Sequence, residues 1–206
     1  MQIILTWINS GGIISYILIL CSICSISFII NRLIFFYLKS RISVESFISK
    51  MENFYEKKDI DSILSLCDFL VLSPFSSIAA AIFKNKDRSH KTIMKIAEKE
   101  LNKNIKDLER YIIVIGTIAN VSVYIGLLGT ILGIMQAFTN ISLQGMGGIE
   151  VVIGGVSKAL VTTAFGLFVA IPAVVFYNYL TNRVENFIND MELLIDETLI
   201  LVGKET

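Results

Sequence analysis

The residues of this sequence that could do chemistry lie in one of its most apolar stretches. The segment Gly154 to Val175, GGVSKALVTTAFGLFVAIPAVV, reads as a membrane-buried helix, yet it carries Lys158, Thr162 and Thr163. A charged residue inside a bilayer costs about 3 kcal/mol on insertion scales, so by default it faces protein or water. Threonine costs less, because its hydroxyl can bond a backbone carbonyl one turn earlier. The pattern indicates a helix face that does not meet lipid.

The composition places these residues in an integral membrane protein. Of the 206 residues, 54% are hydrophobic and only 17% are charged, whereas soluble domains are about a quarter charged. A spanning helix needs roughly 20 apolar residues, and three stretches qualify, at 13–37, 111–138 and 149–180. The sequence therefore predicts an all-α membrane protein with three transmembrane helices. The second and third are long enough to extend into a cytoplasmic helical bundle.

The distribution of Lys and Arg predicts how the chain is oriented. Residues 1–12 and the short loop 139–148 contain none, whereas 38–110 contains most of them and Arg183 follows the third span. We therefore expect a periplasmic amino terminus and short loop, and a cytoplasmic domain and tail (181–206). The leader has no basic residue and no small-residue cleavage site follows, so we expect the first stretch to be a permanent span and not a secretory signal.

Apolar residues at helical spacing predict short helices within 38–110. Pro74 is expected to begin one of them, with Ser73 as its N-cap. A stripe from Ile93 to Leu108 runs directly into the second span. A further stripe in 181–206, with no Gly or Pro between Ala173 and Val202, predicts one continuous helix from the membrane into the cytoplasm.

The polar residues of the cytoplasmic segment form no reactive group. No nucleophile–base constellation and no cluster of metal ligands is present in it. Its alternating charges are typical of solvated helix faces. The formal net charge is zero, so nothing indicates nucleic-acid binding. We expect no enzyme, no metal site and no cofactor.

The second and third spans each carry a stripe of small residues, which let helices approach closely in lipid. The residues expected to pack helices together are Gly126, Gly129 and Gly133 in the second span, and Gly155, Ala159 and Gly166 in the third. Two interpretations stay open: the stripes are packing seams within one protomer, or they line an aqueous path or grip another helix. The polar residues along them favour the second interpretation. Three helices cannot enclose a pore, so such a path would require several copies of the chain.

Two motifs carry a resemblance to a known family. GLLGTILGIMQAF, Gly126 to Phe138, followed by GGVSKALVTTAFGLFVAIPAVVFYN, Gly154 to Asn178, resembles the MotA/TolQ/ExbB proton-channel family, most closely its three-span ExbB and TolQ branches. The resemblance implies a ring-forming homo-oligomer, a pentamer in the ExbB case, around a pore built from the second and third spans. It also implies a bacterial inner-membrane location. A single-span partner of the ExbD/TolR type would place one proton-carrying aspartate in that pore and drive a TonB-like or Tol–Pal transducer.

The resemblance also implies roles for particular residues. Thr130, in the GLLGT motif, and Thr163, before the A-x-G-L run, would offer hydroxyls near the partner's aspartate, through water. Thr162 and Asn120 are expected to line the same proton path. No acid lies within the middle of any span, which fits a channel whose titrating group arrives on another subunit.

The chain departs from the family pattern at two positions. Val123 stands where members commonly have proline, and Lys158 stands where many ExbB-like chains have glutamate. We expect Lys158 at the outer mouth of the pore. Either it pairs with an acid of the partner or with Glu150, two turns earlier, or the outer vestibule is tuned differently from that of other members. A non-conducting membrane scaffold stays open as an alternative. A small-molecule transporter is disfavoured, because the sequence shows no inverted repeat and no midplane helix break.

Overall fold

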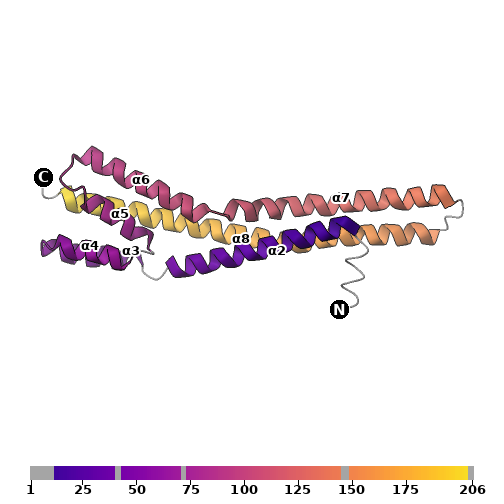
Figure 1. Ribbon diagram of the computed structural model, residues 1–206, viewed down its shortest axis with the longest axis horizontal. Coiled ribbons are helices and arrows are strands. Elements are labelled where there is room, and N and C mark those ends of the chain that lie inside the picture. The colour runs from indigo at the N-terminus through magenta and orange to yellow at the C-terminus, as the bar shows by residue number, and fades with distance from the viewer. Residues whose placement is uncertain (1–11, 40–42, 71–72, 145–148, 204–206) are drawn as a thin grey trace. The chain divides into compact units, whose positions relative to one another are not determined.

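The computed structural model describes residues 12–39, 43–70, 73–144 and 149–203, with 141–144 and 149–152 described by their backbone alone (Figure 1). The regular structure in these ranges is helical. The helices are α2 (Gly12–Lys39), α3 (Val44–Glu56), α4 (Ile60–Phe69), α5 (Pro74–Phe83), α6 (His90–Glu109), α7 (Ile112–Gln144) and α8 (Ile149–Gly203).

Three helices within the described ranges are long and apolar enough to cross a membrane. They lie within Gly12–Glu56, His90–Asn140 and Ile153–Gly203. Large apolar side chains remain exposed along them, for example Ile13 at 80% and Phe168 at 75%. Such surfaces suit lipid and not water. The prediction of an all-α protein with three spans is confirmed, and its assembly into a ring stays a prediction.

The two long carboxyl-terminal helices differ in continuity. α8 runs without a break from Ile149 to Gly203, as predicted for the third span and its tail. The second span was predicted to continue directly from the preceding helix, but α6 ends at Glu109 and α7 begins at Ile112. Between them Tyr111 has a φ of 67°, in the left-handed region that non-glycine residues rarely adopt. The helix path is therefore interrupted there.

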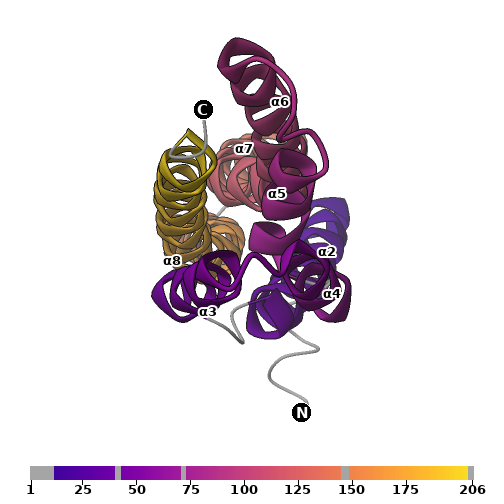
Figure 2. The same ribbon diagram turned by 90° about the vertical axis from the view of Figure 1, so that its left-hand side faces the viewer.

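The described residues form two compact units. The span unit contains residues 12–31, 111–144 and 149–179, and the bundle unit contains residues 32–39, 43–70, 73–110 and 180–203. In the bundle unit, the short helices pack in chain order, α3 on α4, α4 on α5, and α5 on α6 (Figure 2).

Helix α5 begins as the sequence predicted. Pro74 is its first residue, and the Ser73 hydroxyl accepts a hydrogen bond from the Phe75 amide at 3.4 Å. This cap satisfies an amide that the first turn of a helix leaves without a partner. The cap leads directly into the core of the bundle unit, because Phe75 is only 1% exposed.

A buried arginine holds the end of α6. Arg32 is 2% exposed, and its guanidinium donates to the carbonyls of Asp107, at 2.8 Å, and of Leu108. These carbonyls belong to the last turn of α6, where a helix has no backbone donors left and carries its partial negative charge. Arg32 also lies over the Phe35 ring, 4.2 Å from its centroid. The cation therefore stabilises the end of α6 at the interruption.

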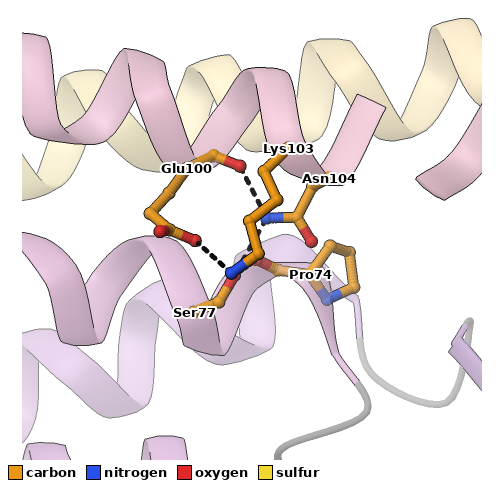
Figure 3. A network of polar contacts seen from close by, with 5 residues as sticks. All are labelled: Pro74, Ser77, Glu100, Lys103 and Asn104. Atoms are coloured by element: carbon orange, nitrogen blue, oxygen red, sulfur yellow. Dashed lines mark hydrogen bonds and ion pairs between the residues drawn. The ribbon is translucent and has the colours of Figure 1, made fainter. Parts of the chain in front are cut away.

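A polar network fastens α5 to α6 (Figure 3). The Asn104 amide donates to the Ser77 hydroxyl and to the Glu100 carbonyl, both at 2.9 Å. The Ser77 hydroxyl donates in turn to the Pro74 carbonyl at 3.1 Å. Because Asn104 is buried, these bonds also remove the cost of placing an amide in the bundle.

Candidate functional site

Helices α7 and α8 approach each other backbone to backbone in the span unit. A Cβ built on Gly126 would lie 3.1 Å from the Cα of Gly166, and one built on Gly166 would lie 2.6 Å from the carbonyl oxygen of Ser122. Real side chains essentially never make a contact as short as that at Gly166, so a side chain there would force the helices to shift, and a side chain at Gly126 would be tightly packed. Interfaces of this kind are typical of helices that associate in lipid.

The close approach continues toward the loop that joins the two helices. A Cβ on Gly133 would lie 2.7 Å from the Ala159 side chain, and one on Gly155 would overlap that of Ala137. A Cβ on Gly129 would likewise overlap Thr162. We call this contact the α7–α8 seam. All six residues expected to pack helices together lie in it: Gly126, Gly129, Gly133, Gly155, Ala159 and Gly166.

The threonine hydroxyls are arranged around the seam. Thr163 donates across it to the Gly126 carbonyl at 3.0 Å. Thr162 donates to the Ala159 carbonyl of its own helix at 2.7 Å, and lies 3.4 Å from the Gly126 carbonyl. Thr130 donates to the Leu127 carbonyl at 2.6 Å. Each hydroxyl therefore donates its proton to a backbone carbonyl, and its oxygen can still accept a hydrogen bond.

The four predicted pathway residues differ in exposure. Thr130 and Thr162 are 8% and 3% exposed within this single chain. Thr163 is half-buried and Asn120 is exposed. Asn120 precedes Thr130 by ten residues, or about 15 Å along the helix, so the structure does not bring it to the threonines. Of the three threonines at the seam, Thr163 is the least buried within this single chain.

Lys158 lines a cavity at the loop end of the span unit. The cavity has a volume of about 650 Å³, and its wall includes Gln136 and Asn140 from α7 and Ile13 from α2. Lys158 itself is exposed. The side chain of Glu150, its proposed partner, lies outside the described residues, so that pairing stays a prediction.

Gln136 and Asn140 were not singled out from the sequence. They are one helical turn apart on α7, so both reach the same face as the cavity. The sequence feature that could have indicated them is the i, i+4 spacing of two amides near the end of an apolar run. That spacing predicts no cavity by itself, because the start of α2, which is distant in the sequence, completes the wall.

Comparison with known proteins decides the family. Residues 71–193 match the family described as the MotA/TolQ/ExbB proton channel family. The match covers more than half of the chain and includes both motifs of the seam helices. The chain belongs to this family. It is therefore a multi-pass membrane protein, and the ExbB/TolQ family is one of transport channels and not of enzymes.

Relatives of this chain include proteins named TolQ and proteins named ExbB. The Tol-Pal system protein TolQ of Haemophilus influenzae is 39% identical over 115 residues, which cover 56% of this chain and 50% of the relative. The biopolymer transport protein ExbB of Aquifex aeolicus is 38% identical over 92 residues, covering 45% and 62%. The ExbB of Salmonella typhimurium is 31% identical over 194 residues, covering 82% and 79%. The chain thus matches about half of the TolQ protein and most of the Salmonella ExbB.

Proposed function

We propose that this protein is a ring-forming subunit of a proton-channel motor in the bacterial inner membrane, which uses the proton motive force to energise an envelope transducer. The family match carries the proposal. The sequence supports it, because the spans hold hydroxyls but no Asp or Glu in 12–39, 111–138 or 151–181, and Glu150 stands at the loop end of the third span. A channel of this composition needs its titrating group from another chain.

The partner is an ExbD/TolR-like protein whose single span brings one aspartate into the pore of a pentamer. The aspartic acid would be neutral against an apolar wall, and would ionise where hydroxyls and water solvate it. Thr163 is our leading contact for this group, since its oxygen can still accept a proton donor and its side chain is half-buried. Each proton that crosses provides about 2.3 kcal/mol per 100 mV of membrane potential.

The charge distribution supports one orientation. A periplasmic amino terminus and a cytoplasmic bundle unit and tail place most Lys and Arg residues on the cytoplasmic side. We propose a TonB-type transport system as the machine served. A Tol–Pal-type motor is the alternative, because relatives named TolQ and ExbB match at similar identity, 39% and 38%.

A non-conducting scaffold is the second candidate function. Thr130 and Thr162 are buried within the chain and donate to backbone carbonyls. Both can therefore be explained by packing alone. On this hypothesis the glycines and threonines only hold the helices together, and no proton passes.

Proton flux separates the two functions. The full chain is reconstituted in liposomes with and without an ExbD/TolR-like partner, and internal pH is followed with a dye while a potassium gradient imposes a potential. We expect flux only with both proteins, and its loss when the partner's membrane aspartate is changed to asparagine. Normal assembly of the pair with no flux above that of empty liposomes would instead establish the scaffold.

A further inference from the structure

The position of Lys158 along the span unit follows from two contacts of the α7–α8 seam on either side of it. Gly155 contacts Ala137, and Ala159 contacts Gly133. Lys158 therefore lies opposite residue 134 of α7. Asn140 is six residues nearer the loop end, or about 9 Å. A lysine chain that snorkels toward the membrane surface approaches the level of the two amides.

The charge of Lys158 is not balanced by any described residue. No ion pair of Lys158 is present within the described ranges. The nearest acid along the helix is Glu150, eight residues away, or about 12 Å. The leader 1–11 and the loop 139–148 contain no acid in their sequence. An anion from outside the chain would complement this charge.

The wall of the cavity is polar at one end and apolar along its side. Lys158, Gln136 and Asn140 supply an ammonium and two amide donors, while Ile13 and Leu132 supply apolar surface. A volume of about 650 Å³ is in the range of small-molecule sites. An occupant that matches this wall has an anionic, oxygen-rich head and a hydrocarbon body.

We propose that this cavity binds an anionic phospholipid, with the phosphate at Lys158, Gln136 and Asn140 and an acyl chain along Ile13 and Leu132. The apolar run of the second span ends near residue 138, between Gln136 and Asn140, so a head held by these amides would lie near the level of lipid phosphates. Basic pockets between membrane helices bind lipid head groups by this chemistry. The site requires only that the helices cross a membrane, so it does not depend on proton conduction.

Lipid retention by the purified full chain tests the site. Native mass spectrometry counts bound lipids after titration with dioleoyl phosphatidylglycerol or with dioleoylglycerol, which has the same chains and no phosphate. We expect the anionic lipid to bind at least about tenfold more tightly, because a charge-assisted contact is worth about 1.5–3 kcal/mol. Lys158→Met should abolish this preference. Lys95→Met, which removes an exposed charge from α6, should not.

A second variant tests the cavity without touching the charge. Gly154 lines the cavity, and a Cβ built there meets nothing within 4 Å. Gly154→Leu should therefore fill the space without a clash and lower binding of both lipids. Gly203→Leu, at another unobstructed position at the end of α8, is its matched control.

Three results would overturn the proposal. One is equal binding of the two lipids by the unmodified chain, and another is an unchanged preference in Lys158→Met. The third is full displacement of phosphatidylglycerol by glycerol 3-phosphate, which would show that the site takes a phosphate and not a lipid. Proton flux is measured separately, so failure here leaves the proposed function intact.

Discussion

Two helix interfaces of this protein, one in each unit, are packed by opposite means. In the span unit, α7 and α8 meet at glycines, with Gly126 and Gly166 in contact through their backbones. In the bundle unit, large rings meet instead: Phe75 lies 6.2 Å from Phe47 and 6.3 Å from Phe187, between ring centroids. The α7–α8 seam therefore contains almost no side-chain volume, whereas the interface around Phe75 is filled by aromatic side chains.

We attribute the difference to solvent, since α7 and α8 are membrane helices and we expect the bundle unit to lie in water. Lipid is as apolar as leucine, so burying large side chains between membrane helices gains little, and close packing and hydrogen bonds carry the association. In water, each buried aromatic ring removes about 150–250 Å² from solvent, at about 25 cal/mol per Å². The span unit should therefore be most sensitive to added atoms, and the bundle unit to removed ones.

The largest effect is expected from Phe75→Ala. Removal of a ring that is 1% exposed should cost about 3–5 kcal/mol, from lost burial and the cavity left behind. The melting temperature of the full chain in detergent should fall by about 6–20 °C. Phe69→Ala removes a ring that is 86% exposed and is the control. Equal shifts in the two variants would contradict a core centred on Phe75.

The opposite change should disturb the span unit. Gly166→Ala adds one methyl against the backbone of Ser122 and Gly126, at a cost of about 1–3 kcal/mol. Gly154→Ala adds the same methyl to open space and should cost nothing. Melting in detergent compares the two. If Gly166→Ala were as stable as Gly154→Ala, the helices would not approach as described.

A smaller effect is expected from the polar network between α5 and α6. Asn104→Ala removes the bond to Ser77 and should cost about 1 kcal/mol. Asn102→Ala is matched in chemistry, because exposed Asn102 donates to the Glu98 carbonyl of its own helix and to no other group among the described residues. The difference between their melting temperatures isolates the bond between helices, and it should vanish in a Ser77→Ala background.

The smallest perturbation is a chemical one in the bundle unit. Burial raises the pKa of the Cys67 thiol to about 11, so at pH 8 its thiolate is about 100-fold scarcer than that of an ordinary cysteine. We expect iodoacetamide to modify Cys67 at least that much more slowly in the folded chain than in urea, with the rate rising up to pH 11. Peptide mass spectrometry follows this site alone. Equal rates in both states would show that α4 is not packed.

The sequence predicted the features that depend on local pattern. Ser73 and Pro74 mark the start of α5, and the small-residue stripes follow from helical periodicity. The interruption at Tyr111 was missed, because the apolar pattern continues across it and no Gly or Pro marks it. A positive φ at tyrosine depends on the surrounding packing and has no sequence signature.

The candidate site was predicted only in part for a similar reason. Lys158 and the threonines attract notice because polar groups are costly in apolar helices. The burial of Thr130 and Thr162 depends on which helix covers them, and the amides of Gln136 and Asn140 matter only beside a distant segment. These features depend on tertiary packing, which helical periodicity does not predict.

We propose that the hydroxyl of Thr163, in the α7–α8 seam, serves the proton path. Thr163→Val keeps the shape of the side chain and removes the hydroxyl, whereas Thr163→Ser keeps the hydroxyl. We predict that, in liposomes containing the partner, Val lowers proton flux by about tenfold to a hundredfold, the equivalent of one lost bond to a charged group. Ser should retain most of the flux. Full flux through an assembled Thr163→Val channel would contradict the account.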